Sequence, residues 1–204
     1  MLSLSSRSPL PALVKVAFAL TFSAISLCAA VPRGWYLSGS NATDYESGID
    51  QTQYQGRRVV YLKAAPTTKG FGTLMQDFRA DDYAGKRVRL SAMLKTENVA
   101  NWAGLWMRVD KSSGASSSPK MLAFDNMQDR PVKGTEDWKN YSVVLDVPND
   151  ATGISFGVLL NGSGNVLLSN VKIGTVGSDV PLTSMAVATT QPRPAAPTNL
   201  DFEP

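Results

Sequence analysis

Histidine is absent from the 204-residue chain, and cysteine occurs once, as Cys28. Without histidine, the Ser-His-Asp and Cys-His arrangements of nucleophilic catalysis cannot be assembled, and most zinc sites lose their usual ligands. The chain also lacks a phosphate-binding loop of the GxxxxGK(S/T) pattern, because Gly70-Phe71-Gly72 is too short to serve as one. A pair of carboxylates could still cleave a glycoside, but nothing in the sequence pairs its acids. We therefore expect a protein that is not an enzyme.

Helical spacing of apolar residues is also nearly absent, so the chain offers no helix-turn-helix. Its net charge is +3, from 20 basic and 17 acidic residues. Residues 1–30 hold two of the bases, Arg7 and Lys15, and none of the acids, so the remainder has 18 bases against 17 acids and a net charge of +1. This near-neutral balance does not predict a nucleic-acid partner or an anionic membrane surface.

The first 30 residues have the features of a secretory signal peptide. Basic residues come first, an apolar stretch follows from Val16 to Leu27, and the small residues Ala29 and Ala30 end it. That pattern is typical of a cleaved signal, and the apolar stretch is shorter than the ~20 residues of a membrane span. The alternative is an uncleaved membrane anchor. We expect an exported protein, periplasmic or extracellular, whose mature chain has no cysteine and therefore no disulfide.

Short extended segments dominate the chain from 31 to 176. They are rich in Val, Leu, Phe and Tyr, and Gly, Pro, Asn and Ser clusters separate them. Many short strands at near-regular spacing predict an all-β fold, a single antiparallel β-sandwich of about 145 residues. Residues 177–204 are rich in Pro, Ala, Thr and Ser and read as a disordered tail or linker. The clearest predicted strands are 57–64, 72–80, 86–97, 104–110, 120–127, 141–148, 154–161 and 165–176.

Strict alternation in two of these segments predicts which side chains face the core. The apolar set of 86–95 alternates with arginine, serine and lysine, as a half-buried antiparallel strand requires. In 104–110 the apolar residues oppose Trp106, Arg108 and Asp110, so an indole beside a guanidinium should face outward. The residues expected in the core are Val88, Leu90, Ala92, Leu94, Leu105, Met107 and Val109.

A polar cluster follows the predicted strand 120–127. Asp125 and Asn126 could brace the next loop by accepting backbone hydrogen bonds, or they could point into a cleft and bind hydroxyl groups. The residues leave both roles open for Asp125 and Asn126, and favour bracing for Asp129 and Arg130. The segment Gly134-Thr135-Glu136-Asp137 reads as a turn before a strand whose Tyr141, Val143, Leu145 and Val147 share one face.

The four tryptophans divide into two pairs. Trp35 and Trp138 are expected to pack the sandwich, as large aromatic residues usually do. Trp106 is expected to be an exposed platform on which the apolar face of a sugar ring stacks, unless a loop covers it. Arg108, Asp125 and Asn126 would be its hydrogen-bonding partners, with Gln76 and Trp102 as weaker candidates.

Several stretches resemble a family of bacterial proteins, and together they cover roughly 32–176. They are PRGWYLSGSNATDYESGID, GFGTLMQDFRADDYAGKRVRLSAMLKTENV, WAGLWMRVD, FDNMQDRPVKGTEDWKNYSVVLDVP and ISFGVLLNGSGNV. They are similar to galactose-binding-like jelly-roll modules, to which many carbohydrate-binding modules belong. The family that these stretches resemble includes modules found beside exported tricorn or C-terminal-processing peptidases. Others are often labelled arabinose-type (AraC) transcriptional regulators, a label that the residues here do not support.

The resemblance implies a jelly roll that binds a glycan or cell-envelope polysaccharide. Two alternatives stay open. One is a scaffold module that docks an envelope protein, and the other is a transcriptional regulator, which only the family label suggests. In such modules the last strand is similar to VWLDD and its acids help hold calcium, whereas Val166 to Asn170 read VLLSN here. The loss of both acids argues against a calcium ion at that edge, and no other cofactor is expected. A membrane contact would arise only through an uncleaved signal segment.

Overall fold

A computed structural model of the chain describes residues 31–114 and 118–183. Nine β-strands and two three-residue 3-10 helices, η1 (Ala42–Asp44) and η2 (Asp81–Tyr83), make up the regular structure of this part. The signal-peptide prediction for residues 1–30 lies outside the described residues. The strands are β1 (Tyr36–Gly39), β2 (Tyr45–Tyr54), β3 (Arg57–Ala64), β4 (Phe71–Arg79), β5 (Lys86–Lys111), β6 (Lys120–Asp125), β7 (Val132–Val147), β8 (Gly153–Asn161) and β9 (Gly164–Val176).

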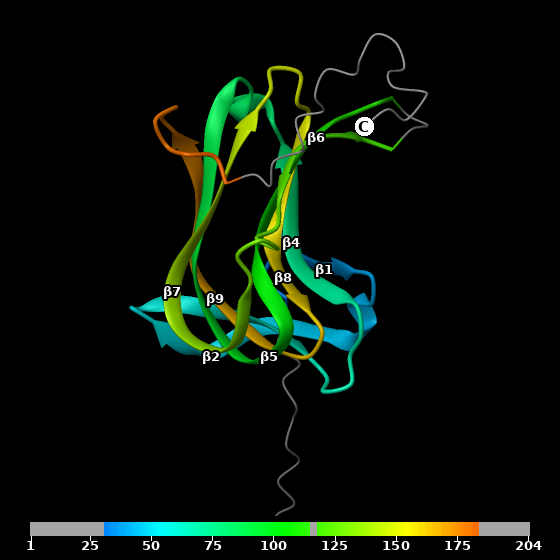
Figure 1. The fold of residues 1–204 in the computed structure, drawn as a ribbon, viewed down its shortest axis with the longest axis vertical. Helices are drawn as coiled ribbons and strands as arrows, with labels where there is room; N and C mark the ends of the chain where they lie inside the picture. Colours follow the sequence, from blue (N-terminus) through cyan, green and yellow to red (C-terminus); the bar gives the residue numbers. More distant parts are fainter. Residues whose placement is uncertain (1–30, 115–117, 184–204) are drawn as a thin grey trace, which may run out of the picture.

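Strand β5 organises the fold because its two halves pair with different neighbours. Its first half pairs with β7 and β9, and β9 continues through β3 to β2; we call this set layer A. Its second half pairs with β8 and β6, and β8 continues through β4 to β1; this set is layer B. All pairings are antiparallel, and Figure 1 shows the sheet curled so that β7 and β9 lie across from β4 and β8. The predicted all-β jelly-roll sandwich is confirmed.

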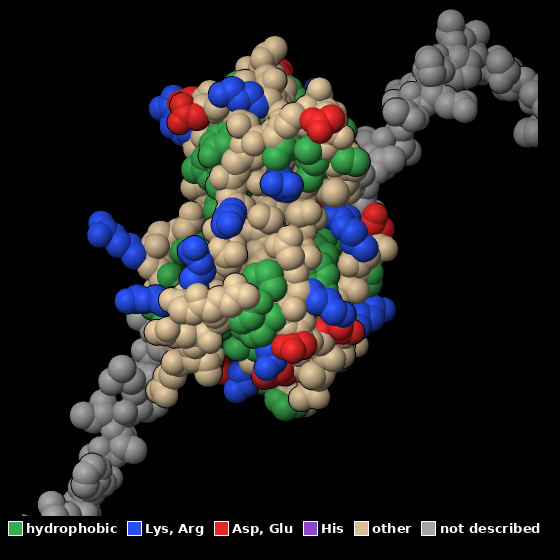
Figure 2. Space-filling view, turned by 90° about the vertical axis from the view of Figure 1, so that its left-hand side faces the viewer, with side chains coloured by type: hydrophobic (Ala, Val, Ile, Leu, Met, Phe, Trp, Pro, Cys, Tyr) green, Lys and Arg blue, Asp and Glu red, His purple; other side chains and the backbone are tan. Residues whose placement is uncertain are grey.

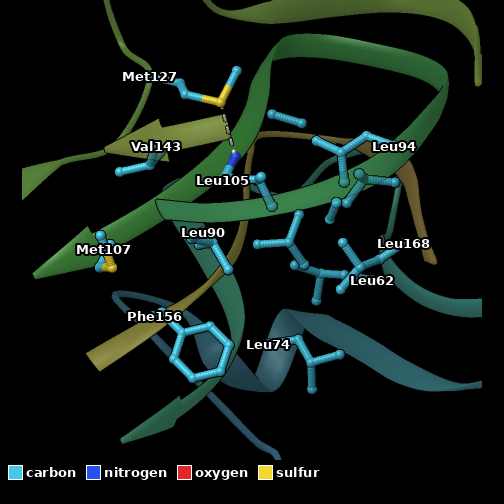
Figure 3. Packing of buried hydrophobic residues seen from close by; sticks show 14 of the residues in the cluster. Leu62, Leu74, Leu90, Leu94, Leu105, Met107, Met127, Val143, Phe156 and Leu168 are labelled. Atoms are coloured by element: carbon cyan, nitrogen blue, oxygen red, sulfur yellow. Dashed lines mark hydrogen bonds between the residues drawn. The ribbon is translucent and has the colours of Figure 1, made fainter. Parts of the chain in front are cut away.

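The core lies between the two layers and contains the residues that alternation selected. Val88, Leu90, Ala92 and Leu94 are buried in the first half of β5, and Leu105, Met107 and Val109 in the second. Figure 3 shows leucines of layer A, among them Leu62, Leu94 and Leu168, pointing toward Leu74 and Phe156 of layer B. Burial of this cluster supplies the main driving force for folding, at about 25 cal/mol per Å² of apolar surface removed from water.

Three sequence predictions about elements are wrong in detail. The segments 86–97 and 104–110 form one strand, since β5 continues through 98–103 with register shifts that keep it paired with β7. Gly134 to Asp137, expected as a turn, belongs to β7 at those shifts. Strand β2 was not among the predicted strands, because its polar sequence YESGIDQTQY shows little apolar alternation.

The tip of the β2–β3 hairpin lies beside β7 (Figure 1). Gln55 and Gly56 make the turn with positive φ angles of 50° and 71°. Tyr54 stacks on Trp138 with ring centroids 4.5 Å apart. Trp138 therefore belongs to this surface contact and not to the core, whereas Trp35 packs edge-on against the core residue Phe156, as predicted.

Residues 177–183, expected to begin the tail, contact the sandwich. Arg87 donates hydrogen bonds to the carbonyls of Ser178 and Val180, and its other side binds Asp146 through two nitrogens at 2.7 and 3.0 Å. The hydrogen bond from Arg87 lowers the pKa of Asp146. Thr183 then exchanges hydrogen bonds with the backbone of Val144. Residues 177–183 thus lie against the sandwich, and the domain boundary at 176 stays a prediction. Among the described residues, no helix is long and apolar enough to cross a membrane.

Candidate functional site

An open hollow of about 640 Å³ lies on the outer face of layer B. Strand register explains which residues line it. Residues two apart along a strand point to the same side of a sheet, and so do residues directly opposite each other on paired strands. The residues that line it are Ser38, Gly39, Ser40, Phe71, Thr73, Met75, Trp102, Trp106, Arg108, Phe124, Asn126, Ser155, Leu159 and Asn161. They come from β1, β4, β8, β5 and β6, together with the residues that follow β1 and β6.

Trp106 forms part of the floor of this hollow and does not stand free of the surface. Its Nε1 donates a 2.7 Å hydrogen bond to Oγ1 of Thr73 on β4. Because β8 lies between β5 and β4, the indole must lie across β8, where the residue in register with Trp106 is Gly157. Only 8% of Trp106 is exposed. Alternation therefore predicted the correct face, but the expectation of an exposed platform was wrong.

Trp102 is the more accessible indole. It is half-buried, it lines the hollow, and its register partner on β8 is Asn161. The next outward position of β5 is Gly104, and a Cβ there would lie 3.5 Å from the ring of Trp102. A Cβ at 104 would be in ordinary contact with that ring, and it would crowd Cβ of Met127 at 3.0 Å and the backbone oxygen of Asn126 at 3.2 Å. Trp102, a weaker candidate from the sequence, is the better placed of the two indoles for contact with a ligand.

Arg108 is the one charged residue among those that line the hollow. Its register partners are Ser155 on β8 and Phe124 on β6. Asp110 lies two residues along the same face, and its Oδ1 accepts a 2.8 Å hydrogen bond from Nε of Arg108. This pair holds the guanidinium by one edge and directs its plane, so the outward position predicted for Arg108 is confirmed.

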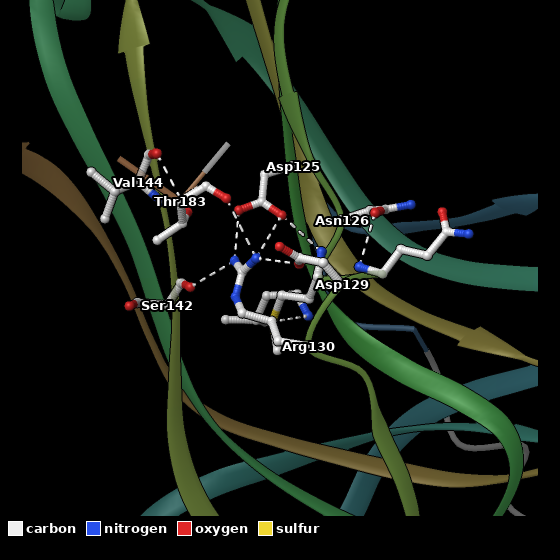
Figure 4. Close-up of polar contacts among 10 residues, drawn as sticks. Asp125, Asn126, Asp129, Arg130, Ser142, Val144 and Thr183 are labelled. Atoms are coloured by element: carbon white, nitrogen blue, oxygen red, sulfur yellow. Dashed lines mark hydrogen bonds and ion pairs between the residues drawn. The ribbon is translucent and has the colours of Figure 1, made fainter. Parts of the chain in front are cut away.

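Asp125 and Asn126 separate into the two roles that the sequence left open. Asp125 is completely buried, and its carboxylate receives hydrogen bonds from the amide of Met127 and from both terminal nitrogens of Arg130, the shortest at 2.6 Å. Figure 4 shows Arg130 held between Asp125, Asp129 and Ser142. Asp125 is thus the brace of the loop after β6, and it does not line the hollow.

The surroundings of Arg130 have opposing effects on its pKa. Desolvation lowers the pKa of Arg130, but its hydrogen bonds and charge interactions with Asp125 and Asp129 outweigh this and leave the pKa raised. Arg130 therefore remains protonated. The guanidinium also reaches the carbonyl of Thr183 at 3.4 Å, so one residue connects the loop after β6 to the segment 177–183.

Asn126 lies on the other side of the loop and lines the hollow. Its Oδ1 accepts a 3.1 Å hydrogen bond from the amide of Gln128, which Figure 4 shows. A backbone N–H needs an acceptor, so this bond orients the amide and leaves the NH2 group of Asn126 for other partners. Gln76, also proposed from the sequence, does not line the hollow.

Several lining residues had no signal in the sequence. Phe71, Thr73 and Leu159 look like ordinary strand residues, and only pairing of β4 with β8 brings them beside the indoles. Ser155 and Asn161 were equally unmarked. Alternation along β8 could have placed Ser155 and Asn161 on one face of that strand. It could not have shown that this face lies beside Arg108 and Trp102.

No group of three or more His, Cys, Asp or Glu side chains that could hold a metal ion occurs within 31–114 and 118–183. In the segment Val166 to Asn170, Oδ1 of Asn170 is buried and has no hydrogen-bond partner in the described structure. One amide oxygen is a poor calcium site, since calcium takes six to eight oxygen ligands. The residues present do not fit a structural calcium ion at this edge.

The curled antiparallel sheet with a hollow on its outer face defines a jelly-roll β-sandwich protein. No family model matches the sequence. The chain is 45% identical over 156 residues to the uncharacterized HTH-type transcriptional regulator YbfP of Bacillus subtilis, a match that covers 75% of this chain and 51% of that protein. The chain therefore spans about half the length of this curated relative.

Solved structures with a similar fold include two family 22 carbohydrate-binding modules. One is the C-terminal module of Clostridium thermocellum Xyn10B, with a TM-score of 0.50, 14% identity, and coverage of 74% of this chain and 90% of the module. The other is the CBM22-1 xylan-binding domain of Paenibacillus barcinonensis Xyn10C, with a TM-score of 0.50, 14% identity and coverage of 74% and 91%.

The enzymatically active domain of tailspike protein 4 from bacteriophage CBA120 is similar to the same extent. Its TM-score is 0.50 at 17% identity, over 71% of this chain and 20% of the tailspike chain. These likenesses show the fold. The resemblance to jelly-roll modules is therefore confirmed for the architecture, and the link to exported peptidases stays a prediction.

Proposed function

We propose that the protein is a non-catalytic glycan-binding module and that the hollow of layer B is its binding site. The observation that carries this proposal is the placement of Trp102 and Trp106 along one open hollow, beside the amides of Asn126 and Asn161. Apolar ring faces bordered by polar groups suit a sugar, whose carbon face stacks on an aromatic ring while its hydroxyls hydrogen-bond. The carbohydrate-binding modules of the same fold support the proposal by analogy.

The lining of the hollow supports binding without catalysis. Glycoside hydrolysis commonly uses two carboxylates on either side of the scissile bond. None of the described residues that line the hollow is an aspartate or glutamate, and Asp110, the nearest acid along β5, is engaged by Arg108. The site therefore offers no acid, base or nucleophile of the carboxylate type. Such binding should be weak and mediated partly by water.

We further propose that the module acts outside the cytoplasm, on the strength of the pattern in residues 1–30. The name of the Bacillus relative suggests a regulator instead. Helix-turn-helix recognition requires α-helices, and the part of the chain that the structure describes has only the two 3-10 helices. A regulatory role would therefore place this sandwich as the ligand-binding part of such a protein.

A protein-docking module is the second candidate, and the surface of layer A favours it. Figure 2 views the side of β7 and the β2–β3 hairpin tip, and basic side chains reach its middle while acidic ones lie toward its periphery. Arg57, Arg58, Arg89 and Lys172 are exposed on strands of layer A, and none has an ion-pair partner within the described ranges. An acidic protein would fit this surface.

Replacement of Trp102 by alanine tests the glycan proposal. A glycan array first identifies a ligand of the wild-type chain, and calorimetric titration then measures both proteins. We expect at least a tenfold loss of affinity in Trp102→Ala, equivalent to about 1.4 kcal/mol, because the stacking surface is removed. The half-buried position of Trp102 should leave the thermal unfolding midpoint nearly unchanged.

Trp138→Ala is the matched control, because it removes an indole that stacks on Tyr54 outside the hollow. It should bind as well as the wild type. Equal loss in both variants would place the site elsewhere, and a silent array with a folded protein would favour the docking module.

A further inference from the structure

The two amide side chains of the hollow each use their oxygen in a hydrogen bond within the protein. Oδ1 of Asn126 accepts from the amide of Gln128 at 3.1 Å, and Oδ1 of Asn161 accepts from Nδ2 of Asn101 at 2.9 Å. Each amide therefore presents its NH2 group to a ligand. The hydroxyl of Thr73 donates to the carbonyl of Val158 and accepts from Trp106, so it has no proton left to donate.

Arg108 adds a further pair of donors. Its Nε is bound to Asp110, and neither terminal nitrogen has a hydrogen-bond partner among the described residues. These two nitrogens form an edge that matches the two oxygens of a carboxylate. Because Asp110 holds the opposite edge, little side-chain freedom is left to lose when a ligand binds.

Acceptors are correspondingly scarce in the hollow. No carboxylate lines it, and the remaining hydroxyls of Ser38 and Ser155 can turn either way. A neutral sugar, with many hydroxyl protons to donate, would find few fixed acceptors. The exposed Asp77, in the same register row as Ser155, receives only long 3.4 Å contacts from Tyr36 and lies outside the lining.

From this donor-rich arrangement, and resting on the proposed glycan-binding function, we infer that the ligand is an acidic glycan whose uronic acid carboxylate binds the terminal nitrogens of Arg108. Ser155 is the register partner of Arg108 on β8, so its hydroxyl borders the same position. The indole of Trp102 would then contact a neighbouring sugar ring along the hollow. Arg108 thus determines specificity, and the indoles supply the apolar contact.

Titration of the full chain with matched acidic and neutral ligands tests this inference. The probes are oligogalacturonate, oligomannuronate and oligoglucuronate of equal length, each beside its own methyl ester, which removes the charge and keeps the ring. We expect at least one acid to bind about tenfold more tightly than its ester, with an advantage that shrinks as salt is added.

Arg108→Gln should lower the affinity for that acid to the level of the ester and leave the ester's affinity unchanged. Arg108→Lys should lose part of the advantage, since an ammonium group cannot offer the paired edge. Arg89→Gln, on layer A, is the control and should bind both ligands as the wild type does. Thermal unfolding of each variant verifies that it is folded.

The outcomes separate this inference from the proposal beneath it. If acid and ester bind equally, or if only neutral or N-acetylated glycans bind, the carboxylate inference is wrong and glycan binding stands. If Arg108→Gln weakens acid and ester alike, the side chain does not recognise the carboxylate. Should the folded protein bind neither these probes nor a glycan array, both proposals fail.

Discussion

At the scale of single residues, the loop after β6 depends on the carboxylate of Asp125. It has no exposed surface, and an ionised group can remain in such a position only if partners replace its water. Arg130 and the amide of Met127 are those partners. Because Asn126 is the next residue, the brace also sets the position of an amide in the hollow.

Asp125→Asn should destabilise the fold by about 2 kcal/mol. The amide can still accept from Met127, but it leaves the guanidinium of Arg130 without its buried countercharge. Urea unfolding measures the loss. Asp129→Asn removes a more exposed partner of the same arginine and should cost less than about 1 kcal/mol. Equal losses of stability in the two variants would show that the burial of Asp125 does not strengthen its contribution to the fold.

At the scale of elements, the site depends on how closely β4, β8 and β5 approach one another. A Cβ at Gly157 would lie 2.3 Å from the backbone oxygen of Leu74 and 2.9 Å from Cα of Met75. The absence of a side chain at 157 therefore permits this pairing. Gly157 of β8 is also the register partner of Trp106 on β5. The indole that forms part of the floor of the hollow therefore lies over Gly157.

Gly157→Ala should destabilise the protein by about 1–3 kcal/mol, the usual range for overpacking, because the backbone of β4 must move. Ligand affinity should also fall, because the hydrogen bond between Trp106 and Thr73 crosses this point. Gly174→Ala in β9 provides the control, since a Cβ there would meet nothing within 4 Å. Chemical denaturation and calorimetric titration test both effects, and a Gly157→Ala protein as stable as wild type would contradict the assigned approach.

At the scale of the whole molecule, the two layers have different surfaces. Layer B carries the hollow with its indoles, and layer A exposes Arg57, Arg58, Arg89 and Lys172, which have no ion-pair partner among the described residues. Under the export proposal, removal of residues 1–30 would change the net charge of the chain from +3 to +1. The proposals of export and of glycan binding are linked, because an envelope polysaccharide is met only outside the cytoplasm.

The full chain, expressed in a bacterial host, should be recovered from the periplasm or the medium as a shorter polypeptide that begins near Val31. The reason is the basic start, apolar stretch and small residues of 1–30. Intact-mass spectrometry of the fractionated protein measures the cleavage. A chain of full length in the membrane fraction would indicate an anchor, and one of full length in the cytoplasm would remove the export proposal.

The alternation of apolar and polar residues in the sequence was enough by itself to predict the fold class and the two faces of β5. It selected the core positions of β5, the outward face of Trp106 and Arg108, and an all-β sandwich, because an antiparallel strand with one buried face must repeat every two residues. It could not show that β5 is one strand, because the register shifts between Leu94 and Ala103 interrupt the period, and only pairing with β7 and β8 shows that the strand continues across them.

Only the tertiary structure decided which outward residues form the site. The sequence marked Asp125 and Asn126 equally, yet one is buried beside Arg130 and the other lines the hollow. It marked Trp106 as exposed, but the indole bonds to Thr73, 33 residues away along the chain. The physical reason is that alternation is a local property, whereas exposure and hydrogen-bond partners depend on which strands lie side by side.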